Sequence, residues 1–97
     1  MDNLIERVIT WGEKHNINNP WTQASKVMEE LGETVGELNH GRFGDAFEDG
    51  IGDTLVSLII FAHINGKSVE KCLEKAVTEI EGRTGKTVDG NFIKDDN

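Results

Sequence analysis

Cysteine and basic residues are scarce in this sequence of 97 residues. A single cysteine, Cys72, cannot form a disulfide within the chain, which is typical of proteins that fold in a reducing compartment. Ten lysines and arginines stand against 18 acidic residues, which gives a formal charge of −8. A nucleic-acid surface requires a basic stripe that displaces counterions, so this charge balance argues against DNA or RNA as a partner.

Long apolar segments are also missing. The longest apolar run, residues 55–64, is far shorter than the roughly 20 residues that a membrane-spanning helix needs. The first residues contain no basic segment followed by an apolar one, so no signal peptide is apparent. We therefore expect a cytoplasmic protein with no membrane partner.

The chain is long enough for one domain, residues 1–97, and its pattern predicts four helices. Asn19 followed by Pro20 is a typical helix start, Gly41 a typical helix stop, and Ser68 a typical N-cap. The expected helices span about 2–15, 20–39, 44–65 and 68–82. They form a helical core of about residues 2–82, which leaves a C-terminal tail, residues 83–97.

Asp89-Gly90 within this tail is a strong signal for a tight turn between two strands. Val88 before it and Phe92-Ile93 after it would form a small hairpin. A disordered tail is the alternative.

The third helix is apolar on every side between residues 54 and 64. Such a helix must be buried on every side, which four helices of one small chain cannot achieve. We therefore expect an all-α, four-helix bundle that assembles as a homo-oligomer, either a dimer or a tetramer. A buried strand over 55–62 is the alternative, but it leaves the helix-length segment around it unexplained.

Carboxylates gather on the second and third helices. The second helix carries an apolar stripe, expected to face the core, and beside it a stripe with Glu30, Glu33 and Glu37. On the third helix Asp49 and Asp53 are i, i+4 partners. If the two helices pack antiparallel, these acids can face each other and bind Mg²⁺ or Mn²⁺, which prefer oxygen ligands. The alternative is that these carboxylates form a solvent-exposed acidic face and bind no metal ion. The apolar stripe comprises Val27, Leu31, Val35 and Leu38.

Four glycines inside these helices each cost about 1 kcal/mol relative to alanine. Gly32 and Gly36 are four residues apart, which we interpret as a close approach of two helices. Gly50 and Gly52 lie among the acids, where the missing side chains would leave space for a metal ion, water or phosphate.

The segments "EELGE" (29–33) and "DGIGDTLVSLIIFA" (49–62) resemble the signature of the MazG-like nucleoside triphosphate pyrophosphohydrolases. That signature is E-E-x-x-E, then a spacer, then E-x-x-D followed by an apolar helix. The resemblance covers roughly residues 20–82, and the ending "TGKTVDGNFIK" is most similar to the small MazG-like proteins of phages and Gram-positive bacteria.

The resemblance implies an all-α fold and hydrolysis of the α–β bond of an NTP or dNTP, giving a monophosphate and pyrophosphate. Its magnesium ligands fall on Glu30, Glu33 and Asp53. The remaining ligand of the signature falls on Gly50, and Asp49 is our prediction for its replacement. Glu29, Glu30 and Glu33 are the expected catalytic acids, with Glu29 assigned to water activation.

The resemblance and the charges also suggest substrate contacts. Lys26 and Arg42 could bind phosphates or be surface charges, and Trp21 could stack on the base or anchor the core. Three functions are then in competition. The first is Mg²⁺-dependent nucleotide-pool cleansing, the second is a catalytically impaired helical module that binds nucleotide or a protein, and the third is a purely structural oligomer.

Overall fold

The computed structural model describes residues 2–95, which form four helices followed by a two-stranded hairpin. The helices are α1 (Asp2–Lys14), α2 (Pro20–Asn39), α3 (Asp45–Ile64) and α4 (Val69–Glu81), and the strands are β1 (Gly85–Val88) and β2 (Asn91–Lys94). This confirms the predicted four helices and the hairpin. Met1, Asp96 and Asn97 of the predicted single domain lie outside the described residues.

Local signals determine the helix boundaries. The side chain of Asn19 accepts hydrogen bonds from the backbone N–H groups of Trp21 and Thr22, and Pro20 occupies the first turn of α2. Gly41 adopts a left-handed conformation with φ of 67°, which ends α2 in the expected way. Ser68 caps α4 by accepting a hydrogen bond from the N–H of Lys71. The hairpin turns at Asp89 and Gly90, both with positive φ.

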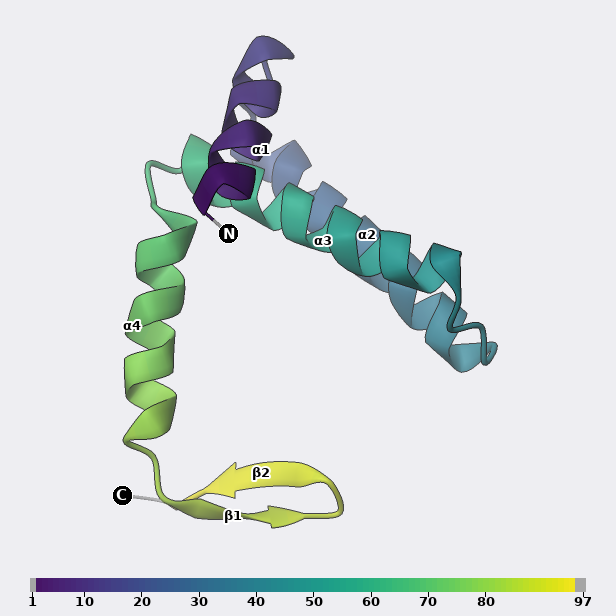
Figure 1. Ribbon diagram of the computed structural model, residues 1–97, viewed down its shortest axis with the longest axis vertical. Helices are drawn as coiled ribbons and strands as arrows, with labels where there is room; N and C mark the ends of the chain where they lie inside the picture. Colours follow the sequence, from purple (N-terminus) through teal and green to yellow (C-terminus); the bar gives the residue numbers. More distant parts are fainter. Residues whose placement is uncertain (1, 96–97) are drawn as a thin grey trace.

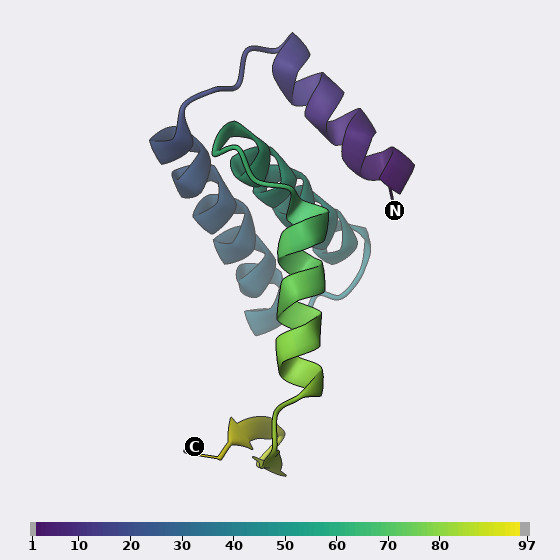
Figure 2. The ribbon, with the colours of Figure 1, turned by 90° about the vertical axis from the view of Figure 1, so that its left-hand side faces the viewer.

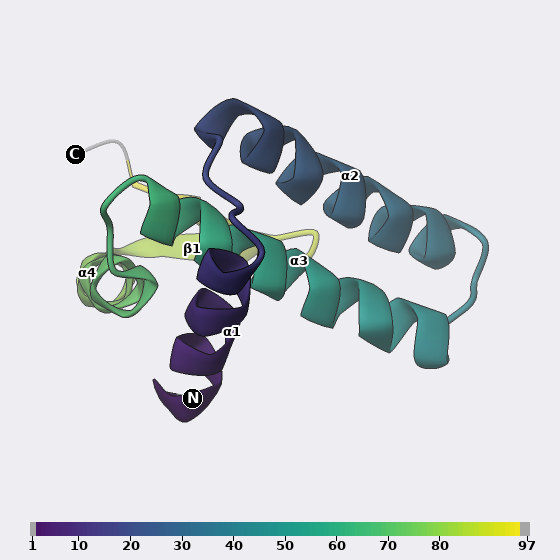
Figure 3. The same ribbon diagram turned by 90° about the horizontal axis from the view of Figure 1, so that it is seen from above.

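Helices α2 and α3 are antiparallel neighbours joined by a short loop (Figure 3). Two contact points define how they meet. Near one end, the Gln23 side-chain amide donates a buried hydrogen bond of 2.9 Å to the backbone carbonyl of Ser57. Further along, Thr34 packs directly on Gly50, where an added Cβ would overlap the Thr34 hydroxyl and lie 3.1 Å from its Cβ. Because Gly50 has no side chain, Thr34 can pack against the backbone of α3 at this point.

The role expected for the glycines is therefore corrected. Gly50 is needed for the contact between α2 and α3, so the space beside it is filled by Thr34 rather than open to a metal ion or phosphate. A methyl group added at Gly32 or Gly36 would meet no atom within 4 Å, so the close helix approach predicted for them does not occur within this chain. The space beside Gly52 is open.

Helix α1 packs on α3 but not on α2, as Figures 2 and 3 show. Gly12 permits this approach, since a Cβ there would lie 3.3 Å from Ile60. Glu13 lies 3.3 Å from the His63 imidazole and adds a polar contact between the two helices. Because α1 and α2 both rest on α3 without touching each other, a groove remains between them with α3 as its floor.

Helix α2 turns polar side chains towards α3 and most of its apolar stripe to solvent, whereas the apolar stripe was expected to face the core. Gln23 and Thr34 are buried, and the Glu30 side chain is only 13% exposed. Leu31, Val35 and Leu38, expected in the core, are all exposed. Cys72 of α4 is exposed as well.

The chain is extended and buries few apolar side chains. Its radius of gyration is 15.9 Å, against about 12.5 Å for a compact domain of this length. Ile59 and Ile60 of α3 are the buried hydrophobic residues of the described chain. Helix α4 packs only on α3 and leads the hairpin away from the other helices (Figure 1). None of the helices formed by the described residues is both long and apolar enough to cross a bilayer.

Candidate functional site: the cleft between α1 and α2

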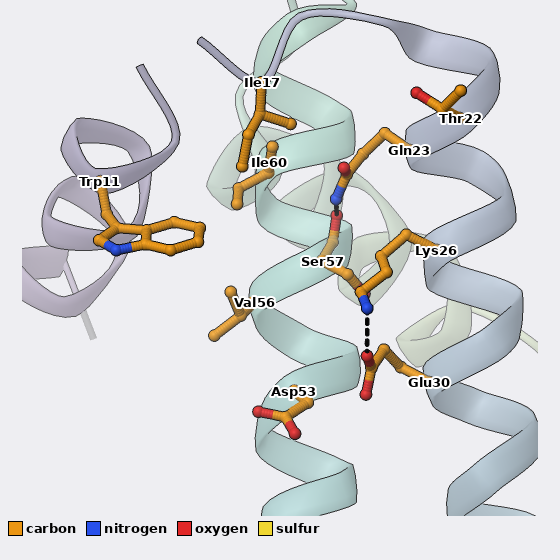
Figure 4. Close-up of a pocket in the computed structure, with 10 residues that line it drawn as sticks. All are labelled: Trp11, Ile17, Thr22, Gln23, Lys26, Glu30, Asp53, Val56, Ser57 and Ile60. Carbon is orange, nitrogen blue, oxygen red and sulfur yellow. Dashed lines mark hydrogen bonds and ion pairs between the residues drawn. The ribbon is translucent and has the colours of Figure 1, made fainter. Parts of the chain in front are cut away.

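A cleft of about 490 Å³ opens where α1 and α2 flank α3, within the range of small-molecule sites. One end of it is apolar and the other carries charged side chains (Figure 4). Residues from all three helices and from the loop before α2 line it: Trp11, Ile17, Thr22, Gln23, Lys26, Glu30, Asp53, Val56, Ser57 and Ile60.

Two of the predicted carboxylates meet at the charged end of this cleft. Glu30 of α2 and Asp53 of α3 both line it, and they lie between the two contact points at which the helices meet. In Figure 4 the Glu30 side chain points from α2 towards α3, where Asp53 lies. The antiparallel packing thus brings together two acids that are 23 residues apart in the sequence.

Lys26 occupies the space beside this pair. Its ammonium lies 3.0 Å from Glu30 Oε1, one helical turn away, and also lines the cleft. A hydrogen bond to Glu30, together with the negative charges of Glu30, Glu29 and Glu33, raises the pKa of Lys26 above its ordinary value of 10.5. Lys26 therefore remains a cation at neutral pH, and the cleft holds one positive and two negative side chains.

The pairing of Lys26 with Glu30 can be tested by NMR titration of the lysine side chain. We expect the titration midpoint of Lys26 to lie above its ordinary pKa of 10.5, and Glu30→Gln to bring it down. A raised folded-state pKa means that the contribution of the pair to stability is complete below pH 10.5 and is lost as the pH rises through the Lys26 midpoint. A Lys26 midpoint unaffected by Glu30→Gln would contradict the pairing.

The other predicted acids lie outside the cleft. Glu29, Glu33 and Asp49 are exposed and do not line it. Within the described residues 2–95, no three histidine, cysteine, aspartate or glutamate side chains are close enough to hold a metal ion together. The predicted four-carboxylate group is therefore not assembled by this chain alone, and magnesium binding remains a prediction.

Two carboxylates nevertheless suit magnesium. Mg²⁺ commonly binds one or two protein carboxylates and completes its octahedron with water and the phosphates of a substrate. Glu30 and Asp53 provide such a pair. Position 50 of α3 cannot provide a further metal ligand, because Gly50 has no side chain and packs on Thr34.

The predicted substrate residues are separated in the structure. Lys26 lines the cleft, but Trp21 is 82% exposed and does not, so its predicted role as a core anchor within the chain is wrong. Arg42 lies in the loop between α2 and α3 and pairs with Glu37, its Nε 2.6 Å from Glu37 Oε2. Lys26 lies in the half of α2 away from this loop.

Two residues outside the predicted site help to form the cleft. Gln23 lies three and seven residues before Lys26 and Glu30, so helical spacing alone places it on the same face. Trp11 comes from α1 and closes the apolar end with its indole ring (Figure 4). No pattern in the sequence indicated a place for Trp11 in the site, because its position depends on how α1 packs on α3.

Comparison with known proteins adds no relative: the sequence matches no family model or curated protein, and the fold matches no solved structure. The likeness to MazG-like enzymes therefore rests on the two acidic motifs and the apolar helix that follows them.

Proposed function

We propose that the chain is a Mg²⁺-dependent nucleoside triphosphate pyrophosphohydrolase of the MazG-like type. The observation that carries the proposal is the meeting of Glu30 and Asp53 in one cleft, with a cationic side chain beside them and an aromatic ring at its far end. These are the two motif acids that antiparallel helices can bring together. The reaction would convert an NTP or dNTP to its monophosphate and pyrophosphate, as in nucleotide-pool cleansing.

Four side chains of the cleft would have a task in this reaction. Glu30 and Asp53 would hold the magnesium, which neutralises phosphate charge and polarises phosphoryl oxygens when it is bound. The Lys26 ammonium would contact phosphate oxygens. The Trp11 indole offers a face on which a base can stack. The oxygen of water would bond to phosphorus as the α–β bridging P–O bond breaks and the other product leaves, and the proton would pass to Glu29 or Glu33, exposed acids of α2 within one turn of Glu30.

We also propose that the protein works as a homo-oligomer. The chain exposes 7673 Å², whereas a compact monomer of 10.8 kDa exposes about 5,500 Å². The excess, roughly 2,100 Å² per chain, includes the outward apolar stripe of α2. Stable homodimers bury on the order of 2,000–5,000 Å² in total, so association of two copies can cover it.

A nucleotide panel tests the proposed activity. The full chain is incubated with each common NTP and dNTP plus Mg²⁺, and pyrophosphate is detected. We expect release from at least one nucleotide, abolished by a chelator. No pyrophosphate from any nucleotide at high protein concentration would contradict an enzyme.

A catalytically impaired, nucleotide-binding module is the second candidate. One observation favours it: within the described residues, no third carboxylate lies with Glu30 and Asp53 in the cleft. A nucleotide that raises the melting temperature without being hydrolysed would select this candidate.

A further inference from the structure

The C-terminal arm, which we define as α4 and the hairpin (residues 69–94), is the least packed part of the described chain. Helix α4 touches only α3, and neither strand contacts any of the four helices. Figures 1 and 2 show the arm leading away from the other helices, with the hairpin at its far end. All strand residues are exposed.

The hairpin is well specified internally. The register pairs Lys86 with Ile93 and Thr87 with Phe92, and the turn at Asp89-Gly90 has the positive φ values that suit the strand twist. An isolated two-stranded hairpin is at best marginally stable in water, because it has no surface on which to bury its side chains. This hairpin therefore needs a packing partner outside its own chain.

Apolar side chains run along the whole arm and have nothing to cover them. Phe92 is 54% exposed, and its neighbours on the arm are similarly open. The large apolar residues exposed on the arm are Leu73, Val77, Ile80, Val88, Phe92 and Ile93. Opposite faces of the hairpin both contribute, since adjacent residues Phe92 and Ile93 point to opposite sides of a strand.

A matching apolar surface lies uncovered on the body of the same chain. We call it the α2 face, formed by Met28, Leu31, Val35 and Leu38. An amphipathic helix that turns its polar stripe inward is stable only if something else covers its apolar stripe. One chain therefore offers both an unpacked arm and an uncovered face.

Charge also favours contact between these two regions. Residues 20–64 contain eight acidic side chains against two lysines and arginines. Residues 83–94 contain three basic side chains, Arg83, Lys86 and Lys94, against one aspartate. A basic hairpin and an acidic helix pair attract each other.

We propose that the C-terminal arm docks on the α2 face of a second copy of this chain. The inference deepens the proposed assembly and is independent of the proposed hydrolysis. The roughly 2,100 Å² of excess surface per chain matches what each partner of a stable homodimer buries. Exchange of an identical terminal element between two copies is a low-cost route to a dimer.

Light scattering after size-exclusion chromatography gives the first test, with the full chain and two paired variants. We expect the wild type to have at least twice the 10.8 kDa chain mass. Phe92→Ser with Ile93→Ser should lower that mass, while Thr87→Ser with Asn91→Ser, on the same strands, should leave it unchanged. A wild-type mass for the first pair would overturn arm docking while leaving the assembly intact. A monomeric wild type would overturn both.

Cross-linking locates the contact without weakening the hairpin. A photo-reactive benzoylphenylalanine replaces Phe92 in an equal mixture of ¹⁵N-labelled and unlabelled chains, and cross-linked peptides are identified by mass spectrometry. We expect mixed heavy–light pairs that join position 92 to peptides of α2. Pairs formed only within one chain, or only with peptides outside α2, would refute the docking site. The outcome says nothing for or against hydrolysis, which the nucleotide panel tests separately.

Discussion

Substitution of Glu30 by glutamine is expected to lower pyrophosphate release by at least about 100-fold, because metal-ion stabilisation is worth several kcal/mol and each 1.36 kcal/mol is tenfold in rate. Glu30 lies on the inner face of α2 with its side chain 13% exposed, and it faces the same cleft as Asp53. Glutamine keeps the size of the side chain but removes the charge that a divalent cation and Lys26 both require. The rate of pyrophosphate release at saturating Mg²⁺ measures the effect.

The matched control for this substitution is Glu48→Gln. Glu48 lies in the first turn of α3, is exposed and does not line the cleft. Removing its charge should leave activity within about twofold, since the screened field of a distant surface charge is weak. Circular dichroism should give the same helix content for both variants. If Glu30→Gln and Glu48→Gln kept equal activity, the cleft would not be the site of hydrolysis.

Replacing Gly50 with alanine is expected to destabilise the fold by up to about 2 kcal/mol. The added methyl group would overlap the Thr34 hydroxyl, and overpacking of this kind costs about 1–3 kcal/mol, partly offset by the ~1 kcal/mol by which alanine favours a helix. For a chain of this size, a loss of up to about 2 kcal/mol lowers the melting temperature by up to about 16 °C. Thermal unfolding at one fixed protein concentration measures it, because association also affects the midpoint.

Gly52→Ala is the matched control, on the same helix two residues further along. A Cβ at Gly52 meets no atom within 4 Å, so only the helix preference applies and stability should rise by up to about 1 kcal/mol. Thr34→Ala, which removes the overlapping hydroxyl, should recover part of the loss caused by Gly50→Ala. Equal stability of Gly50→Ala and Gly52→Ala would show that α2 and α3 do not meet at Gly50.

The helix boundaries could be predicted because they depend on a few adjacent residues. Asn19 with Pro20 starts α2, Gly41 ends it, and Ser68 starts α4, each through its own backbone geometry or a single side chain. The turn at Asp89-Gly90 was predictable for the same reason. Signals of this kind do not depend on the rest of the fold.

Helix packing could not be predicted in the same way. The apolar stripe of α2 indicated which side of the helix should be buried. It did not indicate that α3 would pack against the polar side, where Gln23 and Thr34 make the contacts. The glycine that permits close packing is Gly50, whereas the spacing of Gly32 and Gly36 suggests those two. Sequence spacing predicts which residues share a face of a helix, but it does not predict which element packs against that face.

The candidate site was predictable in part. Motif spacing and an antiparallel helix pair were enough to bring Glu30 and Asp53 together, and Lys26 follows from i, i+4 geometry. Trp11 was beyond prediction, because it reaches the cleft only through the packing of α1 on α3. Trp21, closer to the motif in sequence, is exposed and does not line the cleft.

Phosphorus NMR of the products tests the central claim most directly. The full chain is incubated with Mg²⁺ and the nucleotide that gives the strongest signal in the panel, in water enriched in ¹⁸O. Hydrolysis at the α–β bond predicts a nucleoside monophosphate and pyrophosphate in equal amounts, with one ¹⁸O incorporated per turnover, and at least about 100-fold slower product formation by Glu30→Gln. Release of a nucleoside diphosphate with inorganic phosphate, or an unchanged triphosphate, would contradict the account.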